Sequence, residues 1–134
     1  MSNSTVNVYF LISGDNLVPA KITEELLLQP TDSWMKGDKI SGKNRYRVDS
    51  CWFFGTGDEE SVDITEQFLK ILTVLRNKQD ALIDMRYKYE LEYQFNVIIK
   101  IEGGIKPIMS LDRSVIEEIN KLNASVDFDL YIYS

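Results

Sequence analysis

The sequence predicts a single α+β domain over residues 1–134, a two-layer sandwich with helices on one face of a sheet. Two observations predict this class: apolar residues alternate with polar ones in some segments and recur at helical spacing in others, and the two kinds of segment follow one another along the chain. The length and the 44% hydrophobic content suit one core of ordinary size. We expect a mixed or antiparallel sheet of four or five strands.

The first part of the chain predicts a strand, a helix and a second extended segment. Residues 6–13 alternate apolar and polar side chains, as a strand with one buried face does. Pro19 suits the first turn of a helix that Pro30 ends. Residues 29–44 have the composition of a loop, and the apolar residues in 45–54 predict a strand or hairpin covered on both faces.

The middle of the chain predicts the clearest amphipathic helix. Residues 63–75 carry apolar side chains at helical spacing, with Phe68 and Leu72 on the apolar face, and Asp63 is the expected N-cap. Asn77 is expected to interrupt this helix, after which a second helical piece follows.

Two further strands complete the predicted sheet. Residues 94–101 and 126–133 alternate as strands do, and Ser110 is predicted to cap a helix between them. Residues 7–14 are weakly similar to residues 96–103, and each segment is followed by a proline and a predicted helix. This similarity favours two β-α-β halves on one sheet, either ferredoxin-like or duplicated.

The composition excludes several kinds of chemistry. The chain has no histidine, which excludes serine–histidine triads, cysteine–histidine pairs and imidazole-based zinc sites. Its single cysteine, Cys51, cannot form an intramolecular disulfide or a multi-cysteine zinc site, and we expect a buried thiol. We therefore predict no metal and no cofactor.

The charge distribution favours a protein as the partner. The chain has 15 basic and 21 acidic residues and a net charge of −6, whereas nucleic-acid-binding domains usually present a basic surface. Residues 36–47 are locally basic and residues 58–66 are acidic. No stretch approaches the roughly 20 apolar residues of a membrane span, and no signal peptide is visible. We expect a cytoplasmic protein that contacts neither nucleic acid nor membrane.

Four parts of the sequence resemble an uncharacterised bacterial family, domain of unknown function 4279. They are residues 21–27, Pro30-Thr31 with residues 34–38, the Trp52 segment with the helix after it, and residues 110–131. The last part is the most specific, because an acid-alternating strand that ends in Asp129-Leu130-Tyr131 is unusual. The chain departs from the family at Asn123, where a small residue or glycine is common.

The resemblance implies a small cytoplasmic α+β protein and carries over no catalytic residue. Members resemble small proteins encoded beside secreted toxins, so the resemblance also implies an immunity role.

The last predicted strand carries the first candidate site. Asp127 and Asp129 lie two residues apart, so their side chains share one face, which Tyr131 continues. If helices cover only one side of the sheet, Tyr9 of the first strand lies on the same open surface. Tyrosine gives a large contact area at low entropic cost, which suits a protein interface. The two carboxylates could instead bind a ligand, act as an acid–base pair, or be structural.

Trp34 and Lys36 form the second candidate site, in the predicted loop. The tryptophan is either a contact hot spot or a plug that closes one end of the core. Together these observations predict a non-enzymatic protein-binding module, specifically an immunity protein that neutralises a cognate toxin, and the expected partner is a basic domain of that toxin. The alternative is a small-ligand-binding or carboxylate-based enzyme domain around Asp127 and Asp129. A homo-oligomeric structural protein is a third possibility, and the sequence leaves the oligomeric state open.

Overall fold

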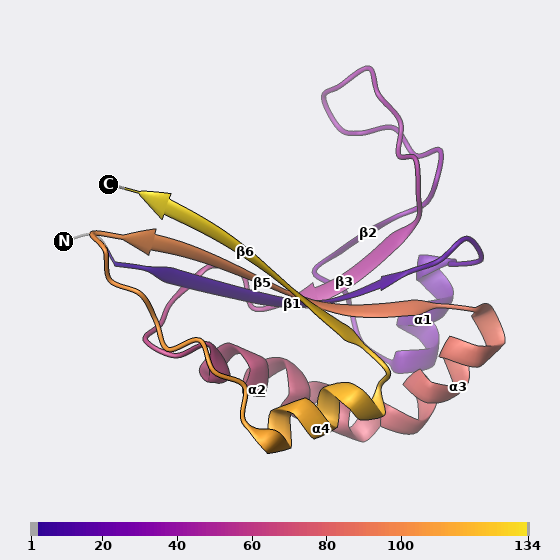
Figure 1. Cartoon of the computed structure of the whole chain (residues 1–134). Coiled ribbons are helices and arrows are strands. Elements are labelled where there is room, and N and C mark those ends of the chain that lie inside the picture. Colours follow the sequence, from indigo (N-terminus) through magenta and orange to yellow (C-terminus); the bar gives the residue numbers. More distant parts are fainter. Residues whose placement is uncertain (1–2, 134) are drawn as a thin grey trace.

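The computed structural model describes residues 3–133 and confirms the α+β class. The strands are β1 (Thr5–Ser13), β2 (Asp32–Trp34), β3 (Cys51–Gly55), β4 (Glu59–Glu60), β5 (Glu92–Glu102) and β6 (Ser125–Tyr133). The helices are α1 (Pro19–Leu26), α2 (Ile64–Leu75), α3 (Gln79–Tyr89) and α4 (Arg113–Lys121), and a 3-10 turn, η1 (Arg76–Lys78), joins α2 to α3. These helices all lie on one face of the sheet (Figure 1).

The sheet has six strands, so the expectation of four or five was too low. The additional strands are β2 and β4, which span only three and two residues and are too short to show an alternating pattern. The predicted strand over residues 45–54 is also shorter, because β3 begins only at Cys51. Residues 35–50 form an arm that rises on the side opposite the helices (Figure 1) and is closed by a bridge between Lys39 and Tyr46.

Strand β1 is the central strand, in a sheet with the order β2-β3-β1-β5-β6 and with β4 paired to β1 beside this path. It runs antiparallel to β3 and to β5, and its pairing with β5 extends from Thr5↔Lys100 to Ser13↔Glu92. Strands β5 and β6 are parallel and flank α4 in the chain, which makes a β-α-β unit of adjacent strands. In the first half β3 lies between β1 and β2, so the ferredoxin-like or duplicated topology is not confirmed.

The hydrophobic core lies between the sheet and the helices. The alternation of β1 and β5 turns one side of each strand toward the helices, where Phe10, Phe95 and their neighbours are completely buried. Helix α2 faces them with Phe68 and Leu72, as its apolar spacing predicted. Burying such side chains contributes about 1.5–3 kcal/mol each, so this layer supplies the rigid support for the other face of the sheet.

The helix ends follow local hydrogen bonding. Asp63 caps α2 as predicted, because its carboxylate accepts a hydrogen bond from the backbone N–H of Thr65. Helix α4 begins later than predicted: its cap is Asp112 rather than Ser110, since the Asp112 carboxylate accepts from the backbone N–H of Val115 at 3.0 Å. Among the described residues no helix is long and apolar enough to cross a membrane.

Candidate functional site

The face of the sheet opposite the helices is the surface available for a site, and we call it the open face. The alternation that buries Val8 and Phe10 places Tyr9 and Leu11 of β1 on this face. The strand register then sets Phe53 of β3 beside Leu11 on the same face. The tyrosine-bearing surface expected from the sequence is therefore present, and it extends from β1 toward β3 as well as toward β5 and β6.

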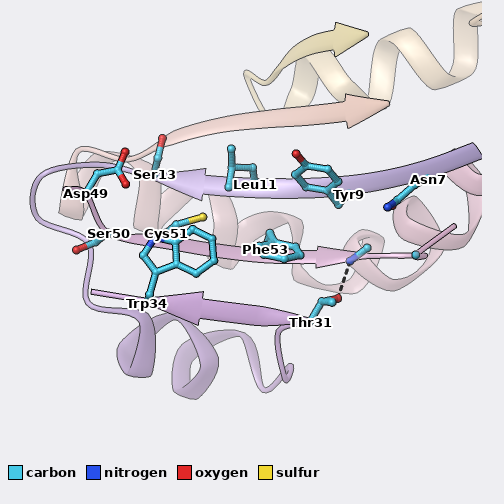
Figure 2. A pocket seen from close by; sticks show the side chains of 12 residues that line it. Asn7, Tyr9, Leu11, Ser13, Thr31, Trp34, Asp49, Ser50, Cys51 and Phe53 are labelled. Carbon is cyan, nitrogen blue, oxygen red and sulfur yellow. Dashed lines mark hydrogen bonds between the residues drawn. The ribbon is translucent and has the colours of Figure 1, made fainter. Parts of the chain in front are cut away.

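A groove of about 590 Å³ lies on the open face, over β1, β3 and β2. Its lining consists of Asn7, Tyr9, Leu11, Ser13, Thr31, Trp34, Asp49, Ser50, Cys51, Phe53, Gly55 and Gly57. Figure 2 shows Tyr9 and Leu11 on β1 next to Phe53 on β3, with Trp34 on β2 to one side and Asp49 at one end. The groove thus has an apolar, largely aromatic floor and polar ends.

Three aromatic rings follow one another across the groove, and we call them the aromatic row (Tyr9, Phe53 and Trp34). The Tyr9 and Phe53 ring centroids are 5.3 Å apart, and those of Phe53 and Trp34 are 6.1 Å apart. Both pairs are inclined, at 55° and 71°, within the favoured range for aromatic contacts. Arg47 of the arm places its guanidinium carbon 3.8 Å from the Trp34 ring centroid, which makes a cation–π contact.

Gly55 lets β3 approach β1 closely under the aromatic row. A Cβ atom on Gly55 would lie 2.4 Å from the Cβ of Tyr9, its register partner, and 3.0 Å from the carbonyl oxygen of Val8. The backbone N–H of Gly55 also donates to the Thr31 hydroxyl at 3.0 Å (Figure 2). Glycine is therefore needed here for space, and any larger residue would displace the Tyr9 side of the groove.

Carboxylates lie near both ends of the groove. At one end Asp58 accepts hydrogen bonds from Asn7 Nδ2 at 3.2 Å and from Lys100 Nζ at 2.7 Å. The hydrogen bond from Lys100 is the main reason that the pKa of Asp58 is lowered, so this group is ionised at neutral pH. At the other end lie Asp49 and Ser50, and the Ser50 hydroxyl accepts from the backbone N–H of Lys36.

Two ionisable side chains of the floor have raised pKa values. Burial, with the nearby Asp49 carboxylate as the next cause, raises the pKa of the Cys51 thiol to about 11. Burial also raises the pKa of Tyr9, with Asp129 as the next cause. Both groups are therefore protonated at neutral pH, where neither a thiolate nor a phenolate is present to act as a nucleophile or base. The expectation of a buried Cys51 is confirmed.

The predicted site residues on β1, β2 and the arm lie near one another. Tyr9 and Trp34 both line the groove. Trp34 lies on strand β2, not in a loop, and its partly buried ring forms a wall of the groove and does not plug the core. Lys36 is exposed at the base of the arm and lines a neighbouring cavity of about 350 Å³ together with Asp49 and Glu92.

The predicted site residues on β6 share the open face but lie outside the groove. Asp127, Asp129 and Tyr131 are exposed on the edge strand, separated from β1 by β5. Gln94 Nε2 donates to Asp127 at 2.9 Å and also to the side-chain oxygen of Asn96. Within residues 3–133 no three histidine, cysteine, aspartate or glutamate side chains gather so as to hold a metal ion.

Among the lining residues that sequence reasoning missed, four shape the groove most directly: Leu11, Asp49, Phe53 and Gly55. Leu11 and Phe53 look like core residues in the sequence, because apolar side chains on both faces of a strand usually indicate burial. A signal was present in the run of aromatic residues that ends in Gly55, since a strand glycine often marks a close approach of two backbones.

The model of the family described as Domain of unknown function (DUF4279) matches residues 4–133. No curated protein and no solved structure matches the chain. The family match includes the groove, the arm and strand β6, so all three belong to the matched domain.

Proposed function

The chain belongs to the family described as Domain of unknown function (DUF4279), and we propose from the groove that it is a non-enzymatic module, which binds a partner protein on the open face. The observation that carries this proposal is the aromatic row at the floor of an uncovered groove. Tyrosine and tryptophan supply much of the binding energy at protein interfaces, where each ring fills a pocket of the partner or receives one of its side chains.

The charges around the groove support a partner segment with basic side chains. Asp49 lies at one end of the groove, Asp58 near the other end is already paired with Lys100, and Asp127 and Asp129 lie on the same face of the sheet. The whole chain has a net charge of −6, which attracts a basic protein over long range. An apolar or aromatic side chain of the segment would contact the aromatic row, and flanking lysines or arginines would approach the carboxylates.

The protonation states also favour binding over catalysis. The raised pKa values of Tyr9 and Cys51 keep both groups neutral, and neutral polar groups are suited to contact. The two aspartates proposed for acid–base chemistry are exposed on β6, outside the groove. A carboxylate there meets solvent, whereas catalytic carboxylates usually lie in a cleft that excludes water.

More specifically, we propose that the partner is a cognate bacterial toxin and that the chain is its immunity protein. The acidic surface and the groove support this role, since an immunity protein needs tight binding and no chemistry of its own. The resemblance to small proteins encoded beside secreted toxins supports it as well.

The test begins with the reading frame beside the gene for this chain. If that frame encodes a secreted protein with a toxic C-terminal domain, co-expression of the chain should restore growth of cells that express the domain. The Tyr9→Ala/Phe53→Ala variant should not restore growth, whereas Tyr9→Phe, which keeps the ring, should. Failure of the wild-type chain both to restore growth and to bind the domain would contradict the immunity role.

The groove volume favours one alternative, a small-ligand-binding domain. A volume of about 590 Å³ lies within the range of about 300–1,000 Å³ that is typical of small-molecule sites. The two functions respond differently to mutation. A small-ligand-binding domain should lose its ligand in the Tyr9→Ala/Phe53→Ala variant and keep it in Asp127→Asn/Asp129→Asn. A protein-binding module should bind its partner more weakly in both variants. An enzyme around the two aspartates would lose turnover in the second variant.

A further inference from the structure

The two edges of the sheet differ in length and in protection. Strand β2, at one edge, has three residues, and β6, at the other, has nine. An exposed edge offers unpaired backbone groups to another strand, and proteins usually protect it by shortness, charged side chains (lysine above all), proline or a bulge. β6 has the sequence SVDFDLYIY, without lysine or proline, and its two charged residues, Asp127 and Asp129, both lie on the open face. Within residues 3–133 it pairs with β5 only.

The helix side of β6 is apolar and exposed. Phe128, Leu130 and Ile132 point to this side and are 43%, 50% and 76% exposed, and we call them the apolar strip. Their register partners on β5 are Val97, Ile99 and Ile101, all of which are buried. The cover of the helices therefore ends between β5 and β6. A contiguous apolar strip along an unpaired edge is characteristic of an interaction surface.

We propose that a second copy of this chain pairs its β6 antiparallel with β6, so that two sheets join into one across a two-fold axis at Leu130. In this register Leu130 faces Leu130 of the second copy, and Phe128 faces Ile132 of the second copy. A two-fold axis perpendicular to the sheet keeps both helix layers on the same side. The two apolar strips therefore meet there and bury each other.

The open face of β6 is complementary to itself in the same register. Asp129 faces Tyr131 of the second copy, and Asp127 faces Tyr133 of the second copy. Each tyrosine hydroxyl can donate a hydrogen bond to the carboxylate opposite, so both faces of the strand find suitable partners. This self-complementarity about Leu130 is the reason to identify the occupant as a second copy.

Other registers are less favourable. A two-fold axis at Asp129 sets that carboxylate against its own copy, and an axis at Phe128 sets Asp127 against Asp129 twice. Like charges directly opposite one another destabilise a strand pair. An axis at Tyr131 separates the carboxylates but pairs only residues 129–133, whereas the axis at Leu130 pairs residues 127–133. The axis at Leu130 therefore gives the longest pairing in which no carboxylate faces another.

Sedimentation equilibrium of the purified chain tests the proposal. The wild type should sediment as a dimer in the micromolar range, and Leu130→Lys should sediment as a monomer with its circular dichroism spectrum unchanged. Leu69→Lys is the matched control, because Leu69 lies on α2, is 41% exposed and should leave the dimer intact. A monomeric wild type, or a Leu130→Lys variant that remains dimeric, would overturn the proposal.

A cysteine scan tests the register without a charge change in the strip. In a Cys51→Ala background, single substitutions Asp129→Cys, Leu130→Cys and Tyr131→Cys are oxidised and run on a non-reducing gel. Residues opposite one another in antiparallel strands have Cα atoms about 4.5–5.5 Å apart, which a disulfide spans. Leu130→Cys should therefore give the covalent dimer in high yield. Stronger cross-linking at Asp129→Cys or Tyr131→Cys would overturn the proposed axis.

Discussion

Arg47 lies over the indole ring of Trp34, with its guanidinium carbon 3.8 Å from the ring centroid. This contact joins the arm, residues 35–50, to strand β2 and to the aromatic row of the groove. Within the arm, the Gly37 N–H donates to the Arg47 carbonyl at 2.8 Å, which holds Arg47 beside the start of the arm, close to Trp34. The arm therefore fixes one wall of the groove, and the position of Trp34 depends on it.

Arg47→Ala should loosen the wall of the groove. Loss of the cation–π contact removes about 0.5–1 kcal/mol and exposes more of the Trp34 ring to water. We expect a red shift of tryptophan emission, to which Trp52 should contribute little because it is completely buried. Lys43→Ala, an exposed substitution on the same arm, is the control and should leave the spectrum unchanged. An unshifted Arg47→Ala spectrum would show that the contact does not hold Trp34.

Truncation of the α2 core face should be costly. Phe68→Ala and Leu72→Ala should each lower the free energy of unfolding by about 2–5 kcal/mol, since both side chains are buried against the sheet. Urea denaturation followed by circular dichroism measures the loss. Leu69→Ala, on the exposed side of the same helix, should change stability by less than about 0.5 kcal/mol. Equal losses for all three variants would contradict the assigned core face.

Gly55→Ala should distort the groove floor. The new Cβ would meet the Cβ of Tyr9 at 2.4 Å, and overpacking of this kind costs about 1–3 kcal/mol. Tyr9→Gly removes the opposing atom, so the double variant should lose less stability than the sum of the two single variants. Thermal or urea unfolding of the wild type, the two single variants and the double variant gives the coupling energy between positions 9 and 55. Additive losses would mean that the strands can separate enough to accept the methyl group.

The Cys51 thiol should react slowly in the folded protein. Its pKa is raised to about 11, so at pH 8 nearly all of it is the unreactive thiol, and the thiolate fraction grows only as the pH approaches that value. Alkylation by iodoacetamide should be slow at pH 8 in buffer and much faster in denaturant, where the pKa returns to its ordinary value. Equal rates in the two conditions would show that the groove floor leaves Cys51 open.

Much of the fold could be predicted because periodicity reports which side of an element is buried. The alternation of β1, β5 and β6 and the helical spacing of α2 were each visible in the sequence. Alternation does not say which strand lies next to which, however. Long-range packing decides that β1 pairs antiparallel with β5 and that β3 lies between β1 and β2. The predicted duplication therefore did not include either arrangement.

The site was predictable only in part, for a related reason. Tyr9 was placed correctly on an open face, because its neighbours in the strand are apolar. The groove also contains Phe53 and Trp34, which lie on short strands next to irregular segments. Their position beside Tyr9 depends on the strand register, which the sequence does not show. The carboxylates of β6 were placed on the correct face, but they lie away from the groove because β5 lies between β1 and β6.

The central claim is that the open face binds a basic partner protein through the aromatic row and the nearby carboxylates. Titration calorimetry of the cognate toxin domain against three folded proteins tests it most directly: the wild type, Tyr9→Ala/Phe53→Ala and Asp127→Asn/Asp129→Asn. We predict that the aromatic variant loses about 2 kcal/mol or more of binding free energy, as hot-spot truncations do. The carboxylate variant should bind more weakly, and its affinity should depend less on salt. Unchanged affinity in both folded variants would contradict the claim and place the contact surface elsewhere.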